Sequence, residues 1–225
     1  MEPTKRPPRG ILAIWNDCRK GAEGEYEEWY RGEHLTERLS IPGFRASWRF
    51  RALDGEPEYF SFYETTDPAV LFSEPYVTRV DNPSALTTRI MSGIFTNATR
   101  ALLTATAQWG TLRGAFAVSV RFDKRPASGL EPALSEMAAR RDVVRAEVWT
   151  PTRADAPVAL SAEQKLRGPD KNVAAAALVE AVNEKEARTV SAALRTALGA
   201  APHIGVYQLF CSLDRKDTDR KGAAP

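Results

Sequence analysis

Cysteine and histidine are scarce in this chain of 225 residues, which contains two of each. Cys18 and Cys211 stand far apart and neither lies in a CxxC motif, so the sequence excludes a disulfide framework and favours two inert thiols. The two histidines, His34 and His203, are also isolated. Because so few ligands are present, no His-rich metal centre is predicted.

Long hydrophobic runs and an excess of one charge are absent as well. No segment approaches the roughly 20 apolar residues that a membrane-spanning helix needs, and the apolar run 11–15 is too short for a signal peptide. The 31 basic and 29 acidic side chains give a net charge of +2 and are interspersed. This pattern is typical of a solvated surface and lacks the one-sided basic patch of a nucleic-acid-binding protein. We therefore expect a cytoplasmic protein that binds neither nucleic acid nor membrane.

Common catalytic motifs are missing too. The sequence contains no GxGxxG, GxxxxGK[ST], GxSxG or HExxH pattern, which excludes the usual signatures of dinucleotide, nucleotide, serine-hydrolase and zinc-protease sites. The composition, with 43% hydrophobic and 27% charged residues, is that of a globular protein. Any chemistry would therefore depend on individual side chains.

The pattern of apolar residues predicts one order of elements twice, β-α-β-β-α-β in each half. Asn82 is expected to cap one of the helices, and the polar connection 151–172 shows no periodic pattern. Alanine favours a helix in 174–183, so only the place of this segment in the repeat indicates a strand. The expected strands are 10–17, 44–53, 58–65, 99–108, 114–122, 143–150, 174–183 and 205–213, and the expected helical regions are 24–40, 67–72, 82–95, 129–141 and 184–198.

This order predicts an α+β fold made of two tandem ferredoxin-like (βαββαβ) repeats, residues 10–110 and 111–213. Each repeat leaves one sheet face open, so two antiparallel sheets are expected to pack into an α+β barrel. The partner sheet can come from the second repeat or from a second copy of the chain, so a homodimer is an alternative. Residues 1–9 and 214–225 are expected to be a disordered arm and tail.

The stretch EYEEWYRGEHLTERL, residues 25–39, is the densest in aromatic and ionisable side chains. A helix at about 100° per residue places six of its side chains within one broad arc. Leu35 and Leu39 fall on nearly the opposite side, whereas a plain core helix would place them with the aromatics. The mismatch predicts either a kink near Gly32 or an aromatic face that meets something polar. The six side chains are Tyr26, Trp29, Tyr30, Glu33, His34 and Glu37.

His34 has two interpretations. In the first, it is a capping or surface residue, and the aromatic side chains beside it are ordinary core. In the second, it is an acid or base for proton transfer, because Glu33 and Glu37 are close enough in sequence to orient or charge its imidazole. The equivalent helix of the second repeat, 129–141, has no histidine, tryptophan or tyrosine. This asymmetry favours one working half and one structural half.

Other side chains near the expected helix and hairpin are candidates for substrate contact. Aromatic residues would form an apolar wall beside His34, and polar residues of the hairpin would contact a carboxylate or phenolate. For Arg49, a solvated sheet edge is an equally good interpretation, and His203 is expected at the surface. The predicted substrate-binding residues are Trp15, Asn16, Trp29, Tyr30, Arg49 and Tyr63.

Residues 25–44 and 48–65 together resemble the dimeric α+β barrel superfamily, and more narrowly its EthD-like members. The shared pattern is an aromatic-rich first helix with a histidine, a Pro-Gly-Phe turn, and a hairpin with aromatic and Tyr-Glu positions. The resemblance covers roughly residues 10–108, and the histidine of the family corresponds to His34. The second, His-free repeat departs from the short single-repeat form. The pocket can therefore lie within one repeat, between repeats or between chains.

The resemblance implies cofactor-free or haem-using proteins: monooxygenases for polyketide aromatics, muconolactone-type isomerases, polyketide cyclases, aldoxime dehydratases and chlorite dismutase-like enzymes. We therefore expect a cofactor-free enzyme in which His34, helped by Glu33 or Glu37, transfers a proton on a small aromatic or unsaturated-lactone substrate. The reaction would be that of an isomerase, cyclase or lyase. Two alternatives are a non-catalytic small-molecule-binding or accessory protein of a catabolic or biosynthetic pathway, and a haem-binding barrel enzyme.

Overall fold

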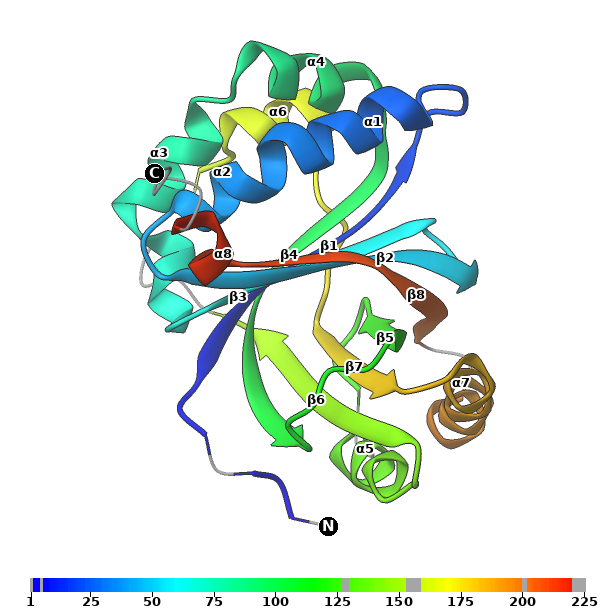
Figure 1. The fold of residues 1–225 in the computed structure, drawn as a ribbon. Helices are drawn as coiled ribbons and strands as arrows, with labels where there is room; N and C mark the ends of the chain where they lie inside the picture. The colour runs from blue at the N-terminus through cyan, green and yellow to red at the C-terminus, as the bar shows by residue number, and fades with distance from the viewer. Residues whose placement is uncertain (1, 5, 127–129, 153–158, 200–201, 220–225) are drawn as a thin grey trace.

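Figure 1 shows the fold in a computed structural model, which describes residues 2–4, 6–126, 130–152, 159–199 and 202–219. The strands are β1 (Arg9–Cys18), β2 (Phe44–Asp54), β3 (Tyr59–Thr65), β4 (Phe95–Trp109), β5 (Phe116–Phe122), β6 (Val143–Pro151), β7 (Ala175–Ala181) and β8 (His203–Asp214). They pair antiparallel and close into one barrel in the order β1-β3-β2-β8-β5-β7-β6-β4. The α+β class and the barrel are therefore confirmed.

Helices cover the barrel on two sides (Figure 1). None of the helices in the described ranges has the length and apolar composition that crossing a membrane requires. Those over the first four strands are α1 (Glu23–Trp29), the π-helical segment η1 (Tyr30–His34), α2 (Leu35–Ser40), the 3-10 segment η2 (Pro68–Phe72), α3 (Glu74–Asp81), α4 (Ala85–Gly93) and α6 (Ala162–Arg167). The others are α5 (Leu130–Ala138), α7 (Glu184–Leu198) and α8 (Arg215–Asp219).

The two halves of the chain contribute four strands each, in matching order. The first half forms β4-β1-β3-β2 and the second forms β8-β5-β7-β6. Antiparallel pairing of β2 with β8 and of β4 with β6 joins the two sets. The sequence left open whether the partner sheet belongs to the same chain. In the structure, the barrel closes within one chain.

Large aromatic side chains fill the middle of the barrel. Trp15 stacks on Phe60 with ring centroids 5.3 Å apart, and Trp149 packs against Phe62 at the same distance. The indole nitrogen of Trp15 donates a hydrogen bond of 2.9 Å to Ser119 Oγ in the opposite half. The barrel interior is therefore a packed core.

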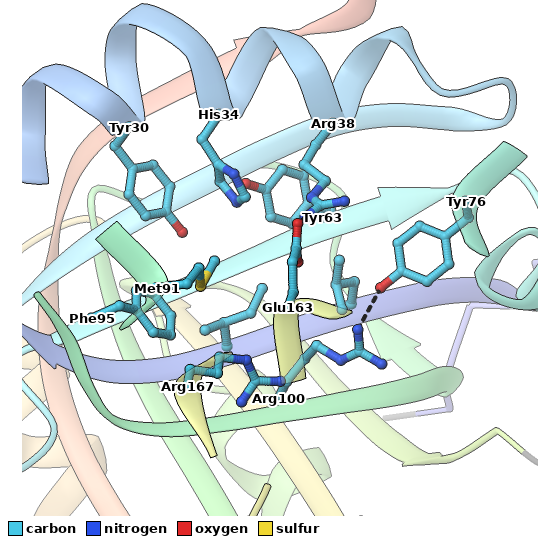
Figure 2. A pocket seen from close by; sticks show the side chains of 12 residues that line it. Tyr30, His34, Arg38, Tyr63, Tyr76, Met91, Phe95, Arg100, Glu163 and Arg167 are labelled. Atoms are coloured by element: carbon cyan, nitrogen blue, oxygen red, sulfur yellow. Dashed lines mark hydrogen bonds and ion pairs between the residues drawn. The ribbon is translucent and has the colours of Figure 1, made fainter. Parts of the chain in front are cut away.

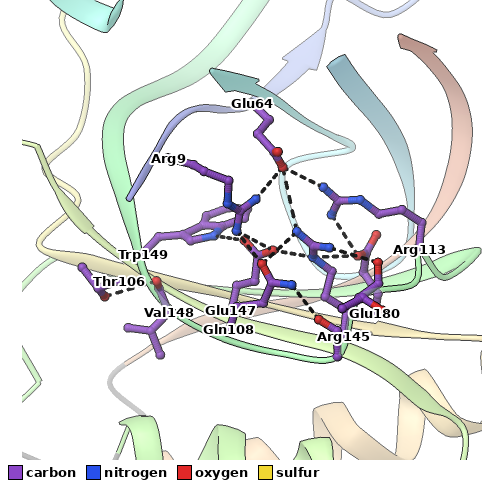
Figure 3. Close-up of polar contacts among 12 residues, drawn as sticks. Arg9, Glu64, Thr106, Gln108, Arg113, Arg145, Glu147, Val148, Trp149 and Glu180 are labelled. Atoms are coloured by element: carbon purple, nitrogen blue, oxygen red, sulfur yellow. Dashed lines mark hydrogen bonds and ion pairs between the residues drawn. The ribbon is translucent and has the colours of Figure 1, made fainter. Parts of the chain in front are cut away.

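A cluster of three arginines and three glutamates fills one end of the barrel (Figure 3). Arg113, for example, bridges Glu64 and Glu180 at 3.0 Å each. Positive and negative groups balance in number, and each forms an ion pair with an opposite charge. With the aromatic core, the cluster leaves the helix-covered outer faces as the place for a ligand. Its members are Arg9, Glu64, Arg113, Arg145, Glu147 and Glu180.

Several expected helices differ in detail from the structure. The region 67–72 forms a single 3-10 segment capped by Asp67. Asn82 was expected to cap the helix that begins there, but Ser84 is the N-cap of α4. The hydroxyl of Ser84 accepts the amide hydrogen of Thr87 at 2.9 Å. Helices α3 and α6 lie in segments where no element was expected, because each is too short to show a clear periodicity.

The alanine-rich strand β7 is confirmed against its helical propensity. All seven of its residues are buried, because β5 and β6 flank it and both faces of the sheet are covered. Small side chains suit such a crowded central position. Tertiary packing therefore overrides the local preference of alanine.

The described residues take in parts of the expected arm and tail. Arg9 already belongs to β1, and the amide of Thr4 donates to the carbonyl oxygen of Gln108 at 2.6 Å. At the other end, β8 runs to Asp214 and α8 follows it. The remaining tail, 220–225, lies outside the described residues.

Replacing Gly32 tests whether the π-helical segment needs a glycine. Gly32 is exposed, and an added Cβ would meet no atom within 4 Å, so Gly32→Ala should raise the free energy of unfolding by about 0.5–1 kcal/mol. Gly110→Ala is the control, because Gly110 has a φ of +72° and an added Cβ would lie 2.1 Å from the Val144 carbonyl oxygen. We expect this change to lower the free energy of unfolding by more than about 1 kcal/mol. Urea denaturation measures both. A destabilising Gly32→Ala would contradict the prediction.

Candidate functional site

One continuous helix, built from α1, η1 and α2, carries most of the predicted site residues. A π turn holds one residue more than an α turn, so it shifts every later residue around the helix by one position. Leu35 and Leu39 therefore return to the face of Tyr26 and Trp29, and all four are buried in one core. The angular mismatch in the sequence has its cause in this π turn, which contains Gly32.

The same helix presents Tyr30, His34 and Arg38 in a row toward a cavity between the helix and the sheet (Figure 2). Their four-residue spacing places one side chain on each successive turn. The cavity therefore lies under the first helix of the first half. Strands β1, β3 and β4 form its floor.

The imidazole of His34 has an aromatic environment. Its ring centroid lies 4.2 Å from that of Trp29 and 5.1 Å from that of Tyr30, and the residue is 5% exposed. Burial, followed by the charges of Arg38 and Arg49, lowers its pKa well below 6.5, so the ring is neutral at pH 7. Its Nδ1 has no hydrogen-bond partner among the described residues. His34 is thus a buried, neutral histidine and not a surface or capping residue.

The carboxylate of Glu33 binds helix α4. It accepts hydrogen bonds from Ser84 Oγ at 2.5 Å and from Thr87 Oγ1 at 3.0 Å. Thr87 in turn accepts the indole N–H of Trp29 at 3.0 Å. Glu33 therefore reaches the imidazole of His34 only indirectly, by fixing the indole ring that packs against it.

The carboxylate of Glu37 points to helix α3, where it pairs with Arg79 at 2.9 Å. Burial raises the pKa of Glu37, and Arg38 and Arg79 partly offset that effect. Within the described ranges, neither Glu37 nor Glu33 forms a hydrogen bond with His34. The structure does not bring the expected carboxylate–imidazole pair together, because both glutamates attach the helix to its neighbours.

Arg49 is completely buried, which excludes the solvated edge that the sequence also allowed. Its guanidinium pairs with both oxygens of Glu27 at 2.7 and 2.8 Å. It also lies 4.2 Å from the ring centroid of Tyr30 and 4.6 Å from that of Tyr59. These contacts place Arg49 behind Tyr30, outside the set of residues that line the cavity.

Trp15 and Asn16 point to opposite faces of β1, as neighbours on a strand must. Trp15 faces the barrel interior, so it does not share a wall with Trp29. Asn16 faces the helices, and its Nδ2 donates to the hydroxyl of Tyr26 at 2.7 Å. Neither residue lines the cavity.

The cavity has a volume of about 20 Å³, which is enough for about one water molecule. Three of its lining residues were predicted from the sequence: Tyr30, His34 and Tyr63. The polar lining residues that sequence reasoning missed are Arg38, Tyr76, Arg100, Glu163 and Arg167.

Two local signals could have found some of the missed residues. Arg38 lies four residues after His34, on the same helix. Ser161 and Gln164 form a capping box that starts α6, the helix that carries Glu163 and Arg167. Because α6 belongs to the second half, both halves of the chain line the cavity.

Three polar atoms around the cavity are buried without a hydrogen-bond partner among the described residues. They are His34 Nδ1, Arg38 Nη1 and Tyr63 Oη. Buried polar atoms are nearly always satisfied, so three around one cavity indicate a place for a ligand or an ordered water. Burial raises the pKa of Tyr63 well above 10, so its hydroxyl remains a donor. The site combines one neutral proton acceptor with two hydrogen-bond donors.

No group of three or more His, Cys, Asp or Glu side chains in the described part of the chain is arranged to hold a metal ion. The side chains that line the cavity have a chemistry of their own. A neutral imidazole can accept a proton, and the arginine and tyrosine can stabilise a negative oxygen.

Comparison with known proteins identifies the fold. No protein-family model and no curated protein matches the chain. Among solved structures, it is similar to an "anthrone oxidase-like protein" (TM-score 0.58, 10% identity, 95% of each chain), to a "Putative monooxygenase" from Fusobacterium nucleatum (0.54, 10%, 94% and 96%) and to a "Putative Chlorite dismutase" (0.52, 11%, 95% and 99%). At 10–11% identity these likenesses show the fold alone, so the α+β barrel that the resemblance implied is confirmed as an architecture.

The lowered pKa of His34 predicts how stability depends on pH. Between the folded-state pKa and about 6.5, the unfolded chain binds a proton at His34 that the folded chain excludes. Stability should therefore fall as the pH drops below 6.5, by up to about 1.4 kcal/mol per pH unit from this group. In His34→Gln this contribution should vanish.

The measurement is urea denaturation of both proteins at pH 7.5 and pH 5. The other buried groups titrate in both proteins, so their contributions cancel in the difference. An equal loss of stability in wild type and His34→Gln would show that the buried imidazole does not resist protonation.

Proposed function

We propose that this chain is a cytoplasmic, cofactor-free, EthD-like enzyme in which His34 transfers a proton on a small aromatic or unsaturated-lactone substrate. The observation that carries the proposal is a set of three polar atoms around one cavity, one acceptor and two donors, that have no partner in the described part of the chain. The matching strand order of the two halves supports an origin as two tandem ferredoxin-like repeats. The first repeat holds the reacting side chains.

The proton transfer follows from the charges of the site. The neutral imidazole of His34 takes a proton from a carbon next to a carbonyl group. Negative charge then develops on the carbonyl oxygen, where Arg38 Nη1 and Tyr63 Oη donate hydrogen bonds. The new imidazolium is repelled by Arg38, and the oxyanion offsets that repulsion. Return of the proton to a different carbon gives isomerisation, and ring closure or loss of a leaving group gives cyclase or lyase chemistry.

The two glutamates have positioning roles in this proposal. Glu33 holds the indole of Trp29 through Thr87, and the indole packs on one face of His34. Glu37 ties the same helix to α3. A fixed ring orientation is what proton transfer requires, because the acceptor nitrogen has to stay aligned with the substrate.

The main alternative is a non-catalytic small-molecule-binding protein. The volume of about 20 Å³ lies far below the roughly 300–1,000 Å³ of usual ligand pockets, so it favours neither function over the other. A substrate can enter only when a wall of the cavity moves. An enzyme converts its ligand and a binding protein does not, so a measurement of turnover distinguishes the two functions.

A haem enzyme is the other alternative, and the cavity does not fit it. A porphyrin is many times larger than about 20 Å³. We therefore expect that haemin added to the purified protein gives the same Soret spectrum with wild type and His34→Gln. A Soret band that depends on His34 would instead support a haem-binding barrel.

Hydrogen–deuterium exchange tests the proton transfer directly, whichever net reaction follows it. In D₂O, the protein should incorporate deuterium into α-angelica lactone or anthrone, measured by proton NMR. His34→Gln should lower that rate by about 10²-fold or more, the usual contribution of a general base. Exposed His203, which pairs with Asp123 at 3.1 Å, provides the control His203→Gln, and its rate should match wild type.

Two outcomes would count against the proposal. Unchanged exchange in His34→Gln would remove His34 as the base. Exchange in wild type no faster than in buffer, for both carbon acids, would favour the non-catalytic alternative.

A further inference from the structure

Helix α6 comes from the second half of the chain but covers the cavity of the first. It belongs to the connection between β6 and β7, yet it packs against α3, α4 and β4 (Figure 1). Its Glu163 and Arg167 line the cavity, and Glu163 points toward Arg38 (Figure 2). One wall of the site is therefore a short element inserted from elsewhere in the sequence.

A small number of contacts holds α6 against the first half. Its first amide donates to Asp81 Oδ1 at 2.9 Å, and Leu166 packs against the core. Its buried polar contact is the ion pair between Glu163 and Arg38. Other side-chain bonds of α6 run to Asp170, within the same connection. Displacing the six-residue helix therefore breaks this ion pair, the hydrogen bond to Asp81 and the packing of Leu166.

Motion of α6 away from the cavity would break the ion pair between Arg38 and Glu163. The side chains of Arg38 and Glu163 are 3% and 6% exposed, and within the described residues Glu163 is the salt-bridge partner of Arg38. Without Glu163, a buried positive charge would remain near the neutral ring of His34. An uncompensated buried charge is strongly unfavourable. Opening is therefore least costly when another negative group replaces Glu163.

We propose that the substrate is a small organic carboxylate whose carboxylate group displaces Glu163 from Arg38 as α6 moves aside. This inference rests on the proposed function, because it names the substrate class of the His34 cavity. Arg38 Nη2, which now contacts Glu163, would donate to the carboxylate and leave Nη1 for the oxyanion, and Arg100 adds a second positive charge to the lining. Apolar side chains of β1 and β4 receive the hydrocarbon part. A neutral ligand of equal size supplies no counter-charge and should bind more weakly.

Two probes that differ in charge and share a ring system test this selectivity: 1-naphthoate and 1-naphthalenemethanol. Isothermal titration calorimetry of the full chain at pH 7.5 gives the dissociation constants. Wild type should bind 1-naphthoate at least about ten-fold more tightly than the alcohol, because only the acid replaces Glu163. Arg38→Gln should abolish that preference, and Arg38→Lys should keep part of it and serves where the glutamine variant does not fold.

Glu163→Gln gives the sharper result. It removes the competing carboxylate and leaves Arg38 without a counter-charge, so 1-naphthoate should bind at least about five-fold more tightly than to wild type and raise Tm by more. The control Glu184→Gln removes a half-exposed glutamate that pairs with Arg188 on α7, and should bind as wild type does.

The outcomes separate the carboxylate site at Arg38 from the catalytic role of His34. Equal affinity for acid and alcohol, unchanged affinity in Glu163→Gln, or absence of 1-naphthoate binding to Glu163→Gln would overturn the carboxylate inference. The same titrations on His34→Gln should show intact binding. Selective binding with no deuterium exchange in wild type would reject the catalytic role of His34 and leave the carboxylate site standing.

Discussion

Closure of the barrel by the β2–β8 and β4–β6 pairings is the constraint on which the rest of the structure depends. It buries the inner faces of both four-stranded sheets, and aromatic rings and balanced charges fill the interior. A ligand therefore has to bind on an outer face, beneath helices. Under α5 and α7, the core consists mainly of small and aliphatic side chains. Under α1 and α2, larger aromatic side chains enclose a cavity whose three buried polar atoms lack a partner among the described residues.

The π turn reconciles two demands on one helix. Its apolar residues must pack on the sheet, and a row of polar side chains must reach the cavity. A regular α-helix would turn Leu35 and Leu39 away from the core that holds Tyr26. The additional residue in the turn corrects this and leaves His34 beside the cavity. π turns are rare and are frequent at functional sites where they do occur, which agrees with the position of this one.

The second half of the chain contributes side chains to the cavity under the helices of the first half. Its own first helix lacks the aromatic and histidine residues of the first half, as the sequence showed. Its connection before β7 nevertheless supplies α6, and Glu163 of α6 neutralises Arg38. Two similar halves inside one chain make such an exchange possible, because a loop of one half can evolve over the site of the other. The site is therefore shared between the two halves.

The sequence by itself determined the alternating strands, the order of elements and the place of His34 on an aromatic helix, because these depend on local periodicity and composition. It did not determine that Trp15 faces the barrel interior, that Arg49 is caged by aromatic rings, or that Glu33 and Glu37 bind α4 and α3. Those facts depend on contacts between residues far apart in the chain. Only tertiary structure brings Glu163 to Arg38, since 125 residues separate them and no local pattern encodes their pairing.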